Sequence, residues 1–270
     1  VERFRSCFAQ LDYVVEPTPG LSHARNRAVD TISTEVVAWI DDDETADENW
    51  LAEIVETFRL HPDAAAVSGS IVPAELEAWP QWWFEKYGGH RKGRGFAKVV
   101  FPHGDTGSQS PLYPLPAYGA GANMALRSDV LAELGGFDYG LGAGTATFGG
   151  EDTLVFTQLL LSGHTVVYQP AAMTRHFHRR GLGELQRQMF GYGVGLTAYY
   201  AALLRWNWRL LLPLLRLLPR AVADVVGGTT SAVTADLPDD FPTGLRRLKL
   251  RGMLLGPVAY VRARRAASSS

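Results

Sequence analysis

The most constraining feature of this sequence is an apolar strand that runs directly into three acidic residues. Residues 36–40, Val-Val-Ala-Trp-Ile, predict a strand buried on both faces in a parallel sheet. Asp41, Asp42 and Asp43 follow without a basic neighbour. Crowded carboxylates repel one another unless a cation neutralises them, and Mg²⁺ or Mn²⁺ prefers such oxygen ligands together with substrate phosphates. The pattern indicates a metal–diphosphate site at a strand end; the alternative is a solvated acidic turn that caps the next helix.

Apolar strands and amphipathic helices alternate along much of the chain. Apolar residues recur at helical spacing over residues 50–58, and another apolar run covers residues 64–72. Strand–helix–strand alternation predicts an α/β fold with a doubly wound, mostly parallel sheet. The other expected elements are strands at 11–15 and 165–169, a helix capped by Ser22, a helix over 128–134 and a helix that follows Asp152.

Three further segments carry residue types suited to ligand binding. Gly149–Asp152 is a second acidic site at the start of an apolar helix, and Gly119–Arg127 contains small residues that let backbone approach a ligand. Residues 175–180 form a cluster with two histidines, His176 and His178. Imidazole can bind a metal and guanidinium can clamp a diphosphate, whereas an exposed basic turn is the alternative interpretation.

Residues 73–118 have little periodicity and are rich in Pro, Gly, Trp and His. Aromatic side chains are concentrated over residues 79–87, with Trp82 and Trp83 at the centre. They predict either packing in a core or lid, or a platform on which an acceptor such as a sugar ring or an apolar lipid group lies.

Six segments occur in an order that resembles the family 2 glycosyltransferases of the GT-A type, which are inverting enzymes that use nucleotide-diphospho-sugars. They extend over about residues 11–195 and comprise Pro19–Ser22 with Ala24–Asn26, Ile40–Asp43, Gly119–Arg127, Gly135–Asp138, Gly150–Thr153 and His176–Arg179. The resemblance implies a GT-A-type, Rossmann-like catalytic domain over residues 1–195. A basic amphipathic helical C-terminal region is then expected over residues 196–270.

The resemblance also implies the donor site. A Mn²⁺ or Mg²⁺ ion is expected at Asp41, Asp43 and His176, with Asp43 the more direct ligand and His178 the other candidate histidine. Such an ion would bridge the two phosphates and stabilise the leaving nucleoside diphosphate. Contacts to the donor or its diphosphate are expected from Arg25, Asn26, Asp41, Asp42, Gly121, Asn123 and Arg179.

Catalysis is expected at the second acidic site. Asp152 is similar to the general base of the family, which deprotonates an acceptor hydroxyl so that it attacks the anomeric carbon opposite the leaving group. Glu151 is expected to orient the acceptor, and Trp82 and Trp83 are expected to bind it. Hexosyl transfer in polysaccharide biosynthesis would use these groups.

One departure from the family pattern concerns the start of the chain. Family members carry two strand–helix units before the strand equivalent to residues 11–15, and these units supply much of the nucleoside-binding surface. We expect this chain to lack them, which would leave the strand at 36–40 short of a neighbour. An inactive, truncated module that binds membrane or a partner is therefore an alternative function.

The charge of the chain is divided unevenly. Residues 205–270 hold 11 Lys and Arg against 4 Asp and Glu, whereas residues 1–204 hold 15 against 24, from totals of 26 and 28. Arginines at 205, 209, 216 and 220 share one side of a helical wheel whose other faces are apolar. This pattern predicts a helix in the interface of an anionic membrane, kinked by Pro213; packing against the catalytic body is the alternative.

Other classes are less well supported by the sequence. A nucleotidyltransferase would also use acids and a metal, but we find no Gly-rich, basic phosphate loop, and no zinc-finger or RNA-binding signature indicates nucleic acid. Cys7 is the one cysteine, so no disulfide forms within the chain. Without a predicted transmembrane span, we expect a cytoplasmic protein that is peripheral on the inner face of the cell membrane.

Overall fold

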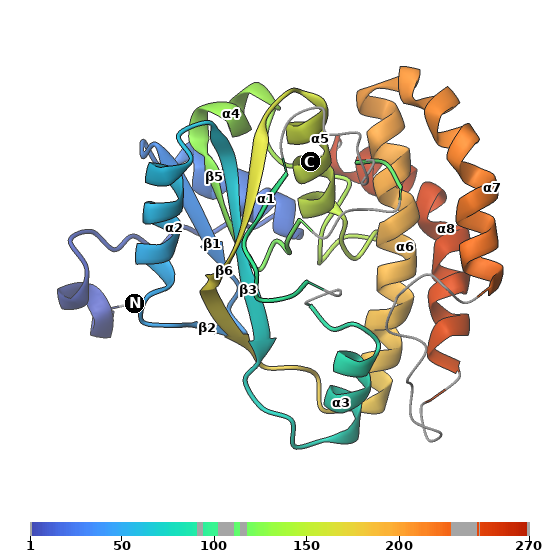
Figure 1. The fold of residues 1–270 in the computed structure, drawn as a ribbon, viewed down its shortest axis with the longest axis horizontal. Helices are drawn as coiled ribbons and strands as arrows, with labels where there is room; N and C mark the ends of the chain where they lie inside the picture. Colours follow the sequence, from blue (N-terminus) through green and yellow to red (C-terminus); the bar gives the residue numbers. More distant parts are fainter. Residues whose placement is uncertain are drawn as a thin grey trace.

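The protein forms a sheet covered by helices, with a group of long helices beside it (Figure 1). A computed structural model describes residues 2–90, 94–101, 111–113, 118–227, 242 and 244–268. Its strands are β1 (Val36–Ile40), β2 (Glu44–Ala46), β3 (Ala64–Pro73), β4 (Val99–Phe101), β5 (Asn123–Arg127) and β6 (Thr165–His176). The described part of the chain therefore has one six-stranded sheet.

The sheet is mixed in its pairing. Its order is β1-β5-β3-β6-β2, and β4 also pairs with β6. Only β3 and β6 form a parallel ladder, because β5 lies antiparallel between β1 and β3, and β2 and β4 lie antiparallel to β6. It follows that β1, β3 and β6 point in the same direction. The predicted α/β class is confirmed, and the parallel direction holds for these three strands.

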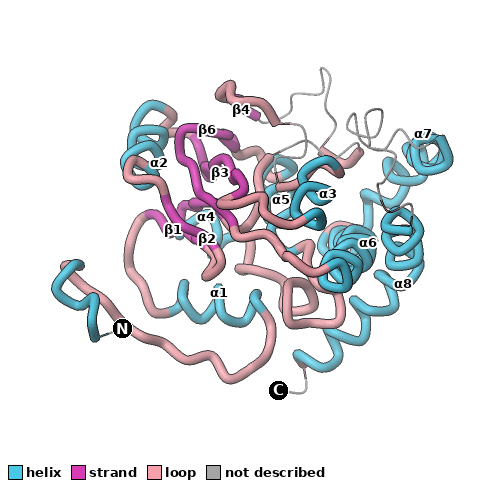
Figure 2. Tube along the Cα trace, turned by 90° about the horizontal axis from the view of Figure 1, so that it is seen from below, coloured by secondary structure: helices cyan, strands magenta, loops and turns pink. Residues whose placement is uncertain are grey.

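Helices cover both faces of the sheet, as a doubly wound fold requires. Figure 2 shows α2 (Trp50–Leu60) on one side of the strands and α5 (Glu151–Leu161) on the other, with the C-terminal helices beyond α5. Successive strand residues point to opposite faces. Accordingly Val67 packs with Ile54 and Phe58 of α2, whereas its neighbour Ala66 packs with Val155 of α5.

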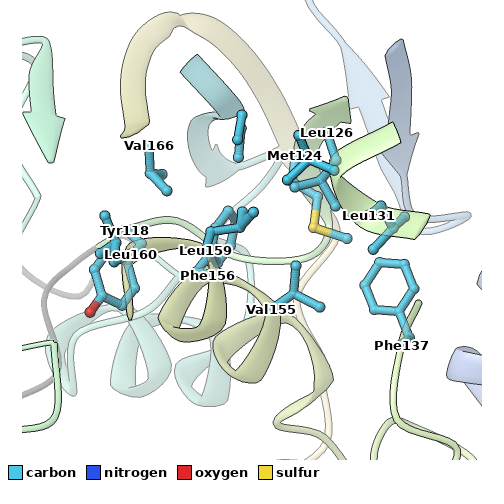
Figure 3. Close-up of a cluster of buried hydrophobic side chains, with 13 residues drawn as sticks. Tyr118, Met124, Leu126, Leu131, Phe137, Val155, Phe156, Leu159, Leu160 and Val166 are labelled. Carbon is cyan, nitrogen blue, oxygen red and sulfur yellow. The ribbon is translucent and has the colours of Figure 1, made fainter. Parts of the chain in front are cut away.

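The larger core lies between the sheet and α5 (Figure 3). Met124 and Leu126 of β5 meet Val155 and Leu159 of α5, and Leu131 of α4 (Ser128–Glu133) closes one end. Burial of large apolar side chains typically contributes about 1.5–3 kcal/mol each. This core therefore fixes α5, and with it the acidic residues at its N-terminus, against the sheet.

Two expectations for the first part of the chain are wrong. Residues 11–15 form no strand, and Tyr13 is 73% exposed. The strand β1 is half-buried, with Ile40 39% exposed, instead of buried on both faces. The exposure of β1 has a clear cause: within the described residues β1 is an edge strand that pairs with β5 alone, so its outer side lacks a neighbour.

Local signals gave most helices correctly but missed some details. The helix α1 (Leu21–Asp30) begins after Gly20, and the hydroxyl of Ser22 donates to the carbonyl of Leu141 at 2.8 Å instead of capping the helix. The aromatic segment contains α3 (Trp79–Lys86), which the periodicity did not indicate. A short 3₁₀ helix, Glu2–Cys7, begins the chain.

The C-terminal region is a group of helices around α6 (Leu182–Trp206), which crosses residue 195 without a break. It packs against α8 (Gly244–Ala267) through backbone contacts at Gly193, Gly252 and Gly256. A Cβ added to Gly193 would lie 1.9 Å from the Lys249 carbonyl oxygen, so the two helices are closer than any side chain permits.

The predicted continuous arginine helix is interrupted. The helix α6 ends at Trp206, a 3₁₀ turn follows at Trp208–Leu210, and α7 (Leu211–Gly227) then begins. Pro213 lies in the first turn of α7, where proline is tolerated, so it does not kink the helix. No helix among the described residues has the length and apolar character needed to cross a membrane.

Candidate functional site

The acidic residues predicted from the sequence meet at one edge of the sheet. Asp41, Asp42 and Asp43 form the turn between β1 and β2, and the Asp43 carbonyl accepts the Phe177 N–H at 3.0 Å, just beyond the end of β6. Asp152 stands at the N-terminus of α5, after Gly150 in the left-handed conformation. The turn after β1, the end of β6 and the start of α5 therefore frame the candidate site.

Arg25 of α1 joins the two acidic segments. Its side chain is 3% exposed, and its guanidinium donates to Glu151 Oε1 at 2.9 Å and to the Gly121 carbonyl at 2.9 Å. A longer contact of 3.5 Å reaches Asp41 Oδ1. The fork geometry of arginine suits it to hold several acceptors at fixed angles. Arg25 thus fixes the relative positions of the first acidic turn and the start of α5.

Gly121 supplies backbone groups at the same place. Its N–H donates to Asp152 Oδ2 at 2.7 Å, and its carbonyl accepts from Arg25. A Cβ at Gly121 would lie 2.9 Å from the Arg25 Nη1 atom and 2.9 Å from the Asp152 Cβ. Glycine is therefore required here for close contact with these two side chains, and the predicted approach of this backbone to a ligand stays a prediction.

The carboxyl groups of the site have perturbed proton affinities. Burial, reinforced by the neighbouring Asp152 charge, raises the pKa of Glu151, and burial likewise raises the pKa of Asp41. Burial also raises the pKa of Glu44 to about 7. These shifts show that negative charge is crowded and poorly solvated at this edge, where a cation would relieve it.

A chain of polar contacts leads away from Asp43. Asp43 Oδ1 lies 3.4 Å from His176 Nε2, and the hydrogen bond with His176 lowers the pKa of Asp43. The Nδ1 atoms of His176 and His178 are 2.8 Å apart, and His178 Nε2 lies 2.8 Å from Glu85 Oε1. His176, the preferred candidate, is thus the histidine that faces the acidic turn, whereas His178 faces α3.

The acidic turn fits a hard divalent cation on the chemistry of its donors. Mg²⁺-type sites use one or two carboxylates plus substrate phosphates, so Asp41 and Asp43 suffice without a complete protein cage. Oε2 of Glu151 is buried without a hydrogen-bond partner among the described residues. An uncompensated buried carboxylate oxygen in this acidic site indicates a need for positive charge.

Two predicted donor contacts have structural roles instead. Asn26 exchanges two hydrogen bonds with the backbone of Phe137, at 2.9 and 2.8 Å. Asn123 is fully buried, and its amide donates to the carbonyls of Ser70 and Ala172 at 3.0 and 2.8 Å. Because these amides are occupied and enclosed, neither is placed to contact a diphosphate.

The remaining predicted residues lie around the site. Asp42 is exposed on the turn, and Arg179, also exposed, lies 3.4 Å from Asp43 Oδ2. Trp82 is 45% exposed, and its indole N–H donates to the Leu76 carbonyl at 3.1 Å. Trp83 is half-buried and packs on the cluster around Phe84.

Sequence reasoning missed three residues of the site. Glu44 directly follows the three aspartates, so its place in the acidic run was visible but was not used. Glu85 and His90 lie in the segment without periodicity, and no local pattern connected them with residues 176–178. Only the packing of α3 beside the end of β6 brings them together, with Gln81 donating to the His178 carbonyl at 3.1 Å.

Two curated proteins are similar to this chain in sequence. The chain is 30% identical over 149 residues to a glucosyl-dolichyl phosphate glucuronosyltransferase of Haloferax volcanii, which covers 52% of this chain and 43% of that protein. It is also 30% identical over 209 residues to the succinoglycan biosynthesis protein ExoM of Rhizobium meliloti. That alignment covers 74% of this chain and 60% of ExoM. The chain therefore spans about half the length of these two curated relatives.

Among solved structures, the chain aligns with a Pyrobaculum calidifontis mannosyltransferase in complex with GDP-Man and Mn²⁺. The alignment has a TM-score of 0.46 and 19% identity, and it covers 91% of this chain and 66% of that chain. A family model described as glycosyl transferase family group 2 matches residues 36–256, which include the acidic turn, Gly121, Asp152 and both histidines. Since this match covers most of the chain, the protein belongs to glycosyl transferase family group 2.

Proposed function

We propose that this chain is the catalytic part of a metal-dependent, inverting glycosyltransferase. It moves a sugar from a nucleotide-diphospho-sugar to a glycan or lipid-linked acceptor at a membrane surface. The observation that carries the proposal is the buried Arg25, which binds Glu151 and Gly121 and contacts Asp41, so that a donor-side acidic turn and an acceptor-side carboxylate are held together. The two relatives, a glucosyl-dolichyl phosphate glucuronosyltransferase and a succinoglycan biosynthesis protein, support a lipid-linked or polysaccharide acceptor.

The donor diphosphate binds at the acidic turn. Asp41 and Asp43 would hold Mn²⁺ or Mg²⁺, which supplies Lewis-acid stabilisation of the leaving nucleoside diphosphate. The sequence predicted His176 as a direct ligand of this ion; in the present proposal His176 instead orients Asp43 through its Nε2 atom, as outer partners of ligating carboxylates commonly do. Arg179 is exposed beside Asp43 and adds a guanidinium that can turn toward phosphate oxygens.

Asp152 acts as the general base. Its Oδ2 accepts the Gly121 N–H at 2.7 Å, and its Oδ1 accepts the Thr153 N–H at 2.6 Å. These backbone donors, with the Thr153 hydroxyl that also donates to Oδ1 at 3.2 Å, fix the orientation of the carboxylate that takes the proton from the acceptor hydroxyl. Attack from this side displaces the diphosphate on the opposite face, which inverts the anomeric configuration. Buried Glu151 supports the reaction by holding Arg25 in place, while its predicted role in orienting the acceptor stays a prediction.

The acceptor lies along α3. Exposed Trp79 and Trp82 and half-buried Trp83 lie on this helix, and Trp79 stacks on Trp83 with ring centroids 6.4 Å apart. The hydrogen bond from Gln81 to the His178 carbonyl fastens α3 beside the donor site. Aromatic faces in this position suit a sugar ring or an isoprenoid chain.

The surface of α7 supports the membrane part of the proposal. Exposed Leu211, Leu215, Leu218 and Val222 follow one stripe of the helix, and exposed Arg216 and Arg220 flank it. Apolar residues beside arginines are typical of helices that lie in an anionic lipid interface. A location on the inner face of the cell membrane follows from this proposal.

The test compares Asp152→Asn with Asp129→Asn. Asp129 is a matched control because it also stands second in a helix and accepts the N–H of the next residue, at 2.8 Å, but lies away from the site. We expect Asp152→Asn to abolish sugar transfer while Mn²⁺-dependent UDP or GDP binding, measured by isothermal titration, stays close to wild type.

Two results would contradict the proposal. Equal loss of transfer and nucleotide binding in Asp152→Asn would remove Asp152 as the base. A folded wild-type chain that binds neither nucleotide, with or without Mn²⁺, would indicate a binding module instead of a transferase.

A further inference from the structure

Three histidines converge where α3 meets the end of β6. Ligand nitrogens of His90, His176 and His178 all lie within 4.8 Å of one another, and the described residues contain no other group of three His, Cys, Asp or Glu side chains that is as compact. His176 and His178 are 6% and 4% exposed, and His90 is half-buried. The rings also lie close, with the His90 and His176 centroids 4.4 Å apart.

The two buried histidines have carboxylates on their outer side. His178 Nε2 lies 2.8 Å from Glu85 Oε1, and His176 Nε2 lies 3.4 Å from Asp43 Oδ1. Both Nδ1 atoms therefore point inward, toward each other. Metal-binding histidines almost always present one nitrogen to the ion while the other ring N–H donates to a carboxylate or carbonyl. This arrangement orients the two rings for such binding.

The spacing of the inward nitrogens is close to what an ion requires. Two imidazole nitrogens bound to one tetrahedral ion at about 2.0–2.1 Å lie roughly 3.3 Å apart. The Nδ1 atoms of His176 and His178 are 2.8 Å apart in a direct hydrogen bond, so an ion binds both only after the rings separate by about half an ångström and turn both nitrogens toward one point. The ligand nitrogens of all three histidines lie within 4.8 Å of one another, so His90 also has to move closer. Phe84 packs edge-on against both His90 and His178, which makes the surroundings apolar on one side.

We propose that His90, His176 and His178 bind a transition-metal ion with the ligand preferences of Zn²⁺, at a site separate from the acidic turn. Imidazole suits Zn²⁺ and related ions, whereas the carboxylates of Asp41 and Asp43 suit Mg²⁺ and Mn²⁺. The fourth position is filled by water. The ion joins the segment that follows α3 to the end of β6, and through His176 it positions Asp43 without contacting substrate.

The proposal is tested on the whole chain, stripped of metal and titrated with Zn²⁺ or Co²⁺ in the presence of excess Mg²⁺. We expect one equivalent of Zn²⁺ to bind, and Co²⁺ to give the intense visible absorption of a tetrahedral site. His90→Ala and His178→Ala should abolish this absorption, while His61→Ala, a histidine at the end of α2, should not change it. Glu85→Gln should weaken Zn²⁺ binding roughly 10–100-fold, as loss of an outer-shell partner does.

The outcomes separate this site from the donor site. Asp41→Asn should remove Mn²⁺-dependent nucleotide binding and leave the Co²⁺ absorption intact, so either site can fail alone. If the histidine variants do not fold, the wild-type Co²⁺ spectrum and the Glu85→Gln titration decide. Absence of a tetrahedral Co²⁺ band in folded wild-type protein, or identical Zn²⁺ affinity in wild type and Glu85→Gln, would overturn the proposal.

Discussion

Replacing Arg25 by Met tests whether one buried guanidinium organises the site. The substitution keeps most of the side-chain volume but removes the donors to Glu151 and Gly121, both at 2.9 Å. Glu151 is left buried and without a counter-ion. Removal of one partner of a buried ion pair typically destabilises a protein by about 3–5 kcal/mol. At 2–4 °C per kcal/mol for a domain of this size, the thermal midpoint should fall by roughly 6–20 °C.

The stability lost in Arg25→Met should also depend on pH, and the structure determines in which direction. The folded-state pKa of Glu151 is already raised, chiefly by burial, and Arg25 is the charge that lowers it. Without Arg25 the pKa of Glu151 rises further. An acid with a raised folded pKa contributes stability that is present at low pH and is lost as the pH rises through that pKa. The Arg25→Met deficit should therefore be larger at pH 8 than at pH 5.

Thermal and urea unfolding, followed by circular dichroism at both pH values, measure these effects. Arg59→Met is the control, because Arg59 pairs with Glu56 on the exposed surface of α2 and its loss should leave the midpoint unchanged. Arg25→Met combined with Glu151→Met should be more stable than Arg25→Met alone, since no buried charge remains unpaired. Equal midpoints for Arg25→Met and Arg59→Met, or a deficit that shrinks at high pH, would refute the reasoning.

Three further predictions concern a glycine of the site, a buried asparagine and two arginines of α7. Gly121→Ala should lower the transfer rate at least about tenfold, because the new Cβ meets Arg25 and Asp152 at 2.9 Å, whereas Gly183→Ala, with nothing within 4 Å, should be active. Asn123→Ala should lower the free energy of unfolding by about 2–4 kcal/mol, because hydrogen bonds to buried carbonyls are lost. Asn49 makes no capping hydrogen bond with its side chain, so Asn49→Ala should leave the free energy of unfolding unchanged. Arg216→Glu with Arg220→Glu should reduce co-sedimentation with anionic vesicles, but not with neutral ones, relative to Arg59→Glu; equal binding by the two proteins would argue against α7 as the contact.

Strong local patterns allowed much of the fold to be predicted. The apolar spacing at Trp50, Ile54 and Phe58 gave α2, and the apolar run after Asp152 gave α5, which begins one residue before Asp152. The family resemblance placed Asp41, Asp43, Asp152 and His176 in one site, and their roles there stay a prediction. Signals of this kind are contained within a few neighbouring residues.

The errors arose where distant segments decide the outcome. Asn26 and Asn123 carry groups that could bind a ligand, but their partners are backbone atoms far along the chain, including Phe137 and Ala172. Burial of β1 depended on its neighbours in the sheet and not on its own apolar residues. The link from His178 to Glu85 spans 93 positions, and no periodicity reports it.

The glycine contacts of α6 limit how far this chain can be divided and recombined. One face of α6 meets α8, where Gly193 lies against backbone atoms. Another face meets the start of α5, the helix that bears Asp152, where Gly195 lies against Gly150. A chimera that joined this catalytic body to the tail of a relative at residue 195 would preserve the fold only if the incoming helices kept glycine at the matching positions. Body and tail therefore pack as one unit, although their charge and surface chemistry differ.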